Sequence, residues 1–138
     1  MNRRRVCLQP SSIRILVVDD SEPWRRFASS TLRKEPGLQV VGEASDGLEA
    51  FQKAVELEPD LILLDIGLPT LNGIEAARRI REIVPEARII FLSEESSADI
   101  VQEAMSLGAW GYVFKTMAAI ELLTAVETVL SGMKFVSI

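Results

Sequence analysis

Short apolar runs alternate along this chain with longer segments in which apolar residues recur three and four positions apart. The runs have the length of β-strands and cover residues 13–18, 38–43, 61–64, 88–92 and 110–114. The segments between them have the spacing of amphipathic helices, most clearly in residues 24–32, 100–105 and 122–130. Five strand-then-helix units predict a parallel sheet with helices on both faces, joined by right-handed crossovers. We therefore expect one doubly wound α/β domain with five strands and five helices.

Turn and cap residues fit this alternation. All six prolines lie in expected loops or, for Pro23, in a first helical turn, where a missing N–H costs nothing. Ser21 and Ser97 are candidate helix N-caps, and Gly108 is a candidate C′ residue that ends a helix. Residues 15–18 and 61–64 contain no polar side chain, which predicts central strands buried on both faces.

The composition excludes several kinds of chemistry. The 138 residues include no histidine, so a His-based catalytic triad, a His-ligated zinc and a histidine general base are excluded. The one cysteine, Cys7, allows no intrachain disulfide, which agrees with a reducing cytoplasm. The net charge of −5 argues against direct nucleic-acid binding by this chain, because such binding depends on clustered Lys and Arg.

The first residues have the character of a leader. Residues 1–12 carry an Arg cluster followed by only three apolar-type residues, too few for the core of a signal peptide. We expect this segment to be disordered, with a basic contact to a partner as the weaker alternative. No apolar run has the length of a membrane span, so we expect a cytoplasmic protein without membrane contact.

Polar groups follow the predicted strands where each one ends. Open parallel sheets bind ligands outside the carboxyl ends of their strands. In this chain Asp19 and Asp20 follow the first run, Asp65 the third, Ser93 the fourth and Lys115 the fifth. Each residue alone has an ordinary explanation as a cap, a turn residue or an edge lysine. Their joint placement on one edge favours a site.

Three neighbouring carboxylates repel one another. At about 4 Å and an effective dielectric near 20, each pair costs on the order of 4 kcal/mol. Lys115 offsets only part of this repulsion. The remainder predicts that one acid stays protonated or that a cation binds. Oxygen ligands favour Mg²⁺ or Mn²⁺ over zinc, and such ions commonly accompany phosphoryl groups. The pattern thus predicts a magnesium-dependent phosphoryl site.

Four segments resemble the receiver domains of two-component response regulators, the CheY-like family: ILVVDDSEPWRR, DLILLDIGLPTLNGIEA, RIIFLSEES and GAWGYVFKT. The resemblance covers residues 13–132. It implies a flavodoxin-like sheet of order 2-1-3-4-5, the order that flavodoxin and CheY share.

The resemblance also implies roles for individual residues. Asp65 would accept the phosphoryl group, and Mg²⁺ or Mn²⁺ would be held by Asp19, Asp20, one Asp65 oxygen and the backbone carbonyl of Gly67. The donor would be a phosphohistidine on a sensor histidine kinase, or a small acyl phosphate. Such a protein is no enzyme beyond catalysing its own phosphorylation and dephosphorylation.

The remaining site residues would form the switch. Lys115 would pair with the phosphoryl group, the Ser93 hydroxyl would turn toward it, and Tyr112 would swing inward as Ser93 moves. New charge at one packed site shifts an equilibrium between two conformations. The face made by the fourth helix, fifth strand and fifth helix would respond, and it is a candidate homodimer surface.

Three residues depart from the commonest family pattern. Thr116 replaces the proline that usually follows the lysine through a cis bond, and a non-proline cis bond costs about 3–4 kcal/mol. Glu94 replaces a small residue after the switch hydroxyl. Trp110 would share a face with Tyr112 if strand alternation holds. It is then either packed under a helix or an exposed interface anchor.

The end of the chain, LSGMKFVSI, resembles the NarL/LuxR-type subfamily, in which a linker and a DNA-binding helix-turn-helix domain follow. Residues 133–138 would then be the start of a linker or a tail. The alternatives are a truncated chain and a stand-alone receiver, and truncation is favoured.

Two rival functions stay open. Haloacid dehalogenase-type phosphatases also phosphorylate an aspartate after an apolar strand, but they require an acid where this chain has Gly67. A degenerate receiver would bind partners without being phosphorylated, and Glu94 and Thr116 are its only support.

Overall fold

A computed structural model describes residues 12–138. Its sheet has six parallel strands in the order β2-β1-β3-β4-β5-β6. The strands are β1 (Ile13–Val18), β2 (Leu38–Ala44), β3 (Leu61–Leu64), β4 (Arg88–Ser93), β5 (Gly111–Phe114) and β6 (Phe135–Val136). The helices are α1 (Glu22–Arg33), α2 (Gly47–Leu57), α3 (Gly73–Ile83), α4 (Ala98–Ser106) and α5 (Ala118–Leu130), with a 3₁₀ turn at Lys115–Met117.

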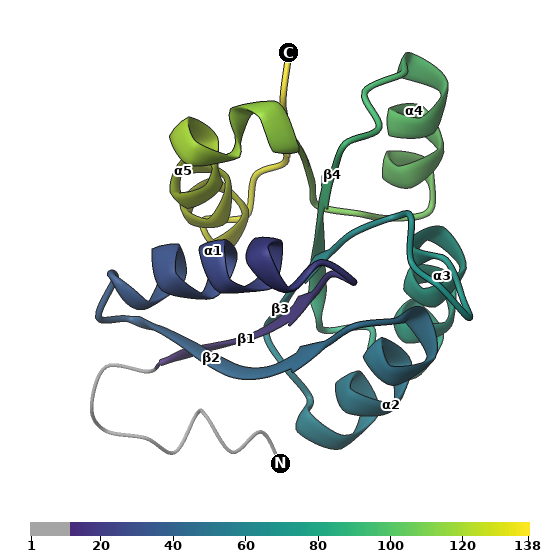
Figure 1. Ribbon diagram of the computed structural model, residues 1–138, viewed down its shortest axis with the longest axis horizontal. Coiled ribbons are helices and arrows are strands. Elements are labelled where there is room, and N and C mark those ends of the chain that lie inside the picture. The colour runs from purple at the N-terminus through teal and green to yellow at the C-terminus, as the bar shows by residue number, and fades with distance from the viewer. Residues whose placement is uncertain (1–11) are drawn as a thin grey trace.

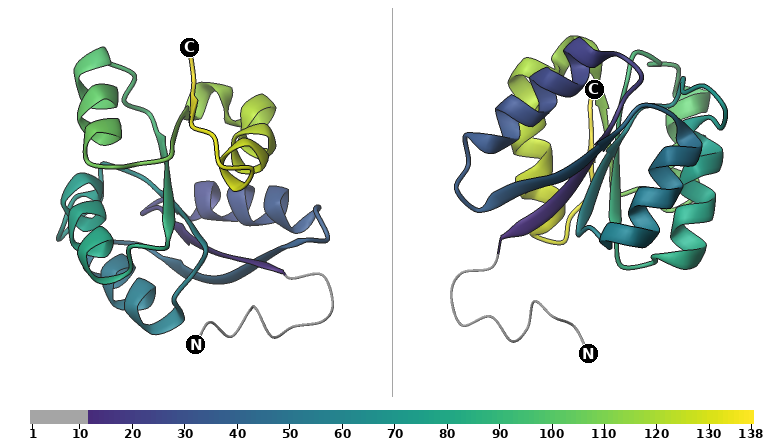
Figure 2. Two further views of the ribbon diagram at one scale, coloured as in Figure 1. Left: turned by 180° about the vertical axis from the view of Figure 1, so that it is seen from behind. Right: turned by 60° about the horizontal axis from the view of Figure 1, so that its bottom comes forward.

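The molecule has three layers (Figure 1). The right-hand view of Figure 2 shows the sheet nearly edge-on, with α1 and α5 on one side and α2, α3 and α4 on the other. The doubly wound architecture and the order of the first five strands are confirmed.

The central strand is buried on both faces, as predicted. Leu61 and Leu63 pack in the cluster beneath α1 and α5, and Ile62 and Leu64 pack in the cluster beneath α2 and α3. All four side chains are at most 1% exposed. The residue after Leu64 therefore follows a rigid strand that places it at the edge of the sheet.

The helix ends also agree with the sequence. Ser21 and Ser97 cap α1 and α4 by accepting backbone N–H groups of Trp24 and Ile100. Gly108 has a φ of +109°, the left-handed conformation that commonly follows a helix.

The sixth strand is an addition to the five that the sequence predicts. Phe135 and Val136 pair in parallel with Gly111 and Tyr112 of β5. Ser137 then donates its N–H to the Tyr112 carbonyl, and its hydroxyl accepts the Phe114 N–H. The segment expected to be a linker or tail therefore includes a strand. The expected leader lies, apart from Ser12, outside the described residues, as does Cys7.

Candidate functional site

Three carboxylates converge at the carboxyl edge of the sheet. Val18 and Leu64 are paired residues of β1 and β3, so Asp19 and Asp65, which follow them, emerge side by side. Asp20 is next to Asp19 but exposed, whereas Asp19 and Asp65 are 3% and 7% exposed. One oxygen from each of the three residues lies within 4.8 Å of the others. The predicted acidic cluster is therefore present.

Backbone N–H groups hold two of these carboxylates in place. Asp19 Oδ1 accepts the N–H of Ser21 at 2.9 Å, and Asp65 Oδ1 accepts the N–H of Ile66 at 2.7 Å. The Arg25 guanidinium donates to the Asp19 carbonyl at 2.7 Å. The loops that follow β1 and β3 thus fix the orientation of the Asp19 and Asp65 carboxylates.

Lys115 supplies the positive charge of the site. It follows β5, and its Nζ lies 2.7 Å from Asp19 Oδ2 and 3.2 Å from Asp65 Oδ2. No peptide bond within residues 12–138 is cis, so the Lys115–Thr116 bond is trans. The lysine reaches the acids without the usual proline after it.

Burial and pairing change the proton affinities of this cluster. Burial raises the pKa of Asp19, although the hydrogen bonds from Lys115 and Ser21 lower it; the charge of Asp65 raises it further. Burial alone would lower the pKa of Lys115, but its hydrogen bond to Asp19 and the charges of both acids raise it overall. The site therefore keeps Lys115 charged beside Asp19, whose carboxylate is destabilised by burial.

The donor set fits a hard divalent cation. Three carboxylates at this separation, with oxygen as the only ligand atom, match the preferences of Mg²⁺ and Mn²⁺. Gly67 lies in the exposed loop after Asp65, where its backbone carbonyl remains a predicted ligand.

Ser93, the last residue of β4, and Tyr112 of β5 are linked through one residue. The Ser93 hydroxyl accepts the N–H of Glu95 at 3.0 Å, and the Tyr112 hydroxyl donates to the Glu95 carbonyl at 2.7 Å. Both side chains are buried, with Tyr112 fully enclosed. Burial raises the pKa of Tyr112, a hydrogen bond with Ser93 lowers it, and the charges of Glu95 and Asp65 raise it. The two predicted switch residues are thus in one connected group.

Trp110 does not share the face of Tyr112, so that expectation is wrong. It precedes β5 and packs, half-buried, against the cluster beneath α1 and α5, whereas Tyr112 belongs to the opposite cluster. The Arg88 guanidinium lies 4.3 Å from the centre of its ring. Strand alternation fails because the strand begins only at Gly111. A role of Trp110 as an interface anchor stays a prediction.

Three supporting residues were missed by the sequence analysis. Arg25 donates a hydrogen bond to the Asp19 carbonyl and forms an ion pair with Glu43 at 3.3 Å. Trp24 lies over Lys115. Gly73 begins α3 so close to the Asp65 carbonyl that an added Cβ would lie 2.0 Å from that oxygen. Only Gly73, placed at the start of a helix, carried a signal in the sequence.

A family model for the response regulator receiver domain matches residues 15–127. The chain belongs to this family. The match includes the ends of β1, β3 and β5 that place the acids and Lys115, and it agrees with the resemblance drawn from the sequence.

Two curated relatives match most of this chain. The transcriptional regulatory protein LnrK of Bacillus subtilis is 38% identical over 120 residues, which are 87% of this chain and 54% of that protein. The protein-glutamate methylesterase/protein-glutamine glutaminase of Thermotoga maritima is 45% identical over 112 residues, 80% of this chain and 32% of that protein. The chain spans about half the length of LnrK and a smaller part of the methylesterase.

A solved structure gives the same fold. The LuxR-family two-component response regulator from Aurantimonas is 36% identical, has a TM-score of 0.86, and covers 91% of this receiver and 89% of that chain. Within the described residues of the receiver, no helix is long and apolar enough to cross a membrane.

Proposed function

We propose that this receiver accepts a phosphoryl group on Asp65 and passes the resulting change to its α4–β5–α5 face. The observation that carries the proposal is the meeting of three carboxylates with Lys115, at 2.7 Å from Asp19 and 3.2 Å from Asp65. An aspartate in such a site needs mostly alignment and charge neutralisation to act as acceptor.

Asp19, Asp20, Asp65 and the Gly67 carbonyl would hold Mg²⁺ or Mn²⁺. When bound, the ion neutralises the charge of the incoming phosphoryl group. A carboxylate oxygen of Asp65 forms the new O–P bond while the N–P bond of a phosphohistidine breaks and returns its electron pair to the imidazole. With no histidine in this chain, the donor imidazole would belong to a sensor histidine kinase, which this receiver would meet in the cytoplasm.

Lys115 and Ser93 respond to the added charge of about −1.5 to −2. Lys115 exchanges its contact with Asp65 for one with the phosphoryl oxygens. The Ser93 hydroxyl gives up the Glu95 N–H and turns toward the same group, which also disturbs the Tyr112–Glu95 contact. A homodimer through α4–β5–α5, and a DNA-binding output domain beyond this chain, would read that change.

The test is incubation with acetyl phosphate and Mg²⁺, followed by intact mass. We expect one added phosphoryl group, absent in Asp65→Asn and retained in Asp99→Asn, which changes an exposed acid in the first turn of α4. No added mass, under conditions that label another receiver, would support a module that binds partners without phosphorylation. Turnover of a phosphate ester would support the phosphatase instead.

A further inference from the structure

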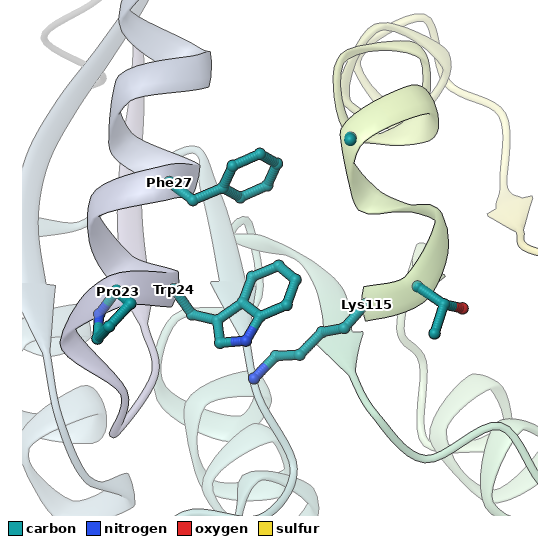
Figure 3. Close-up of a pocket in the computed structure, with 6 residues that line it drawn as sticks. Pro23, Trp24, Phe27 and Lys115 are labelled. Carbon is teal, nitrogen blue, oxygen red and sulfur yellow. The ribbon is translucent and has the colours of Figure 1, made fainter.

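Trp24 lies against the ammonium group of Lys115. Trp24 is in the first turn of α1, and the Lys115 Nζ is 4.8 Å from the centroid of its indole ring. Figure 3 shows the indole extending from α1 toward the α5 side, with the lysine side chain reaching beneath it. A cation at this distance is attracted to the π electrons of the ring, and tryptophan gives the strongest contact of this kind.

The indole is packed on one side and open on the other. The ring of Phe27, one turn later in α1, meets it edge-on at 5.4 Å and 84°. A cavity of about 280 Å³ opens beside it, lined by Pro23, Trp24, Phe27, Lys115, Thr116 and Ala119. The indole also packs against the cluster beneath α1 and α5, so its contacts with that cluster, Phe27 and Lys115 together orient it.

Within residues 12–138, the structure gives the Lys115 ammonium group three contacts for its charge. Two are the carboxylates of Asp19 and Asp65, and the third is the Trp24 ring. A lysine stem is flexible, so each contact removes freedom from the ammonium group. When Asp65 accepts a phosphoryl group, its contact with Lys115 is exchanged, while the ring contact can persist.

We propose that Trp24 is a positioning residue for Lys115. The indole holds the ammonium group toward the carboxylates and covers it from solvent, so that its charge is aligned when Asp65 reacts. Alignment of this kind is a main source of catalysis in phosphoryl transfer. The effect on rate rests on the proposed function of Asp65, but the effect on the placement of Lys115 does not.

The first test compares Trp24→Phe and Trp24→Leu in the whole chain. With phosphoramidate and Mg²⁺, the phosphorylation rate should fall in the order Trp, Phe, Leu, with leucine about 3- to 10-fold slower. Trp110→Phe is the matched control, because its ring contacts Arg88 instead, and its rate should be unchanged.

The second test reads the lysine without phosphorylation. Acetylation by an amine reagent, followed by peptide mass spectrometry, should be faster at Lys115 in Trp24→Leu than in wild type. The exposed Lys34 and Lys134 serve as internal references.

The third test separates π attraction from packing. In the Trp110→Phe background, fluorinated tryptophans at position 24 weaken the π face with little change of shape. Phosphorylation should slow stepwise with the number of fluorine atoms. A rate independent of fluorination, or Lys115 acetylation unchanged in Trp24→Leu, would overturn the proposal. If wild type takes up no phosphoryl group, the proposed function fails, and the acetylation comparison alone decides the placement of Lys115.

Discussion

Replacing Lys115 with methionine should destabilise the protein and make its stability depend on Mg²⁺. The ammonium group lies 2.7 Å from Asp19 Oδ2 and 3.2 Å from Asp65 Oδ2, and the three side chains are between 5% and 10% exposed. Methionine keeps an apolar stem but leaves two buried carboxylates without a counter-charge. Breaking a buried pair costs about 3–5 kcal/mol; because these acids lie at the edge of the sheet, we expect about 2–4 kcal/mol at neutral pH.

The assay is urea unfolding with and without Mg²⁺, with Lys134→Met as the control at an exposed lysine. A cation bound to the folded state stabilises it according to its affinity. Mg²⁺ should therefore restore more free energy of unfolding to Lys115→Met than it adds to wild type, since it supplies the missing positive charge. Lys134→Met should follow wild type.

The deficit of Lys115→Met should also depend on pH. Burial raises the pKa of Asp19 above its ordinary value of 3.8. The folded state therefore binds this proton more tightly than the unfolded chain does, and the resulting contribution to the free energy of unfolding is complete below 3.8 and is lost as pH rises through the folded pKa. The hydrogen bond from Lys115 lowers the pKa of Asp19, so Lys115→Met should raise that pKa further and widen the pH range over which stability is lost. The deficit should grow as pH rises from about 4 to 7. A variant as stable as wild type at pH 7 without Mg²⁺, or a deficit unaffected by both Mg²⁺ and pH, would refute the reasoning.

Two further substitutions test the surrounding structure. Gly73→Ala should cost about 1–3 kcal/mol or more in thermal or urea unfolding, because the new Cβ meets the Asp65 carbonyl; Gly37→Ala, with open space around it, should change stability by less than about 0.5 kcal/mol. Glu49→Gln should cost about 0.3–1 kcal/mol at pH 7. The N–H of Ser45 lowers the pKa of Glu49, so this contribution is present above 4.5 and is lost as pH falls through the folded pKa. Equal stabilities of the two glycine variants, or a Glu49→Gln deficit that persists near pH 3, would contradict these assignments.

The strands could be predicted from sequence because burial on both faces leaves an unbroken apolar run. Residues 61–64 show this most clearly, since their side chains pack in both core clusters. The acids could be placed because parallel strands bring their carboxyl ends to one edge, whatever the details of packing. Asp19, Asp20, Asp65 and Lys115 follow directly from that rule.

Other features depend on contacts that no local pattern encodes. Phe135 and Val136 form a strand too short to show alternation, and they join the sheet because the edge of β5 is available. Strand alternation predicts the wrong face for Trp110 because the strand begins only at Gly111. The contact of Trp24 with Lys115 joins residues of α1 and the end of β5, which only the packing of α1 beside α5 brings together.

Because β6 pairs with β5, residues 135–137 are coupled to any movement of β5. Ser137 is bonded to the backbone of both Tyr112 and Phe114, and its hydroxyl also donates to Glu121 of α5. A shift of β5 relative to the remaining sheet would carry Ser137 with it. A probe attached to Ile138 would therefore track displacement at Tyr112 without altering the tyrosine, and tension applied to that end would load the same strand.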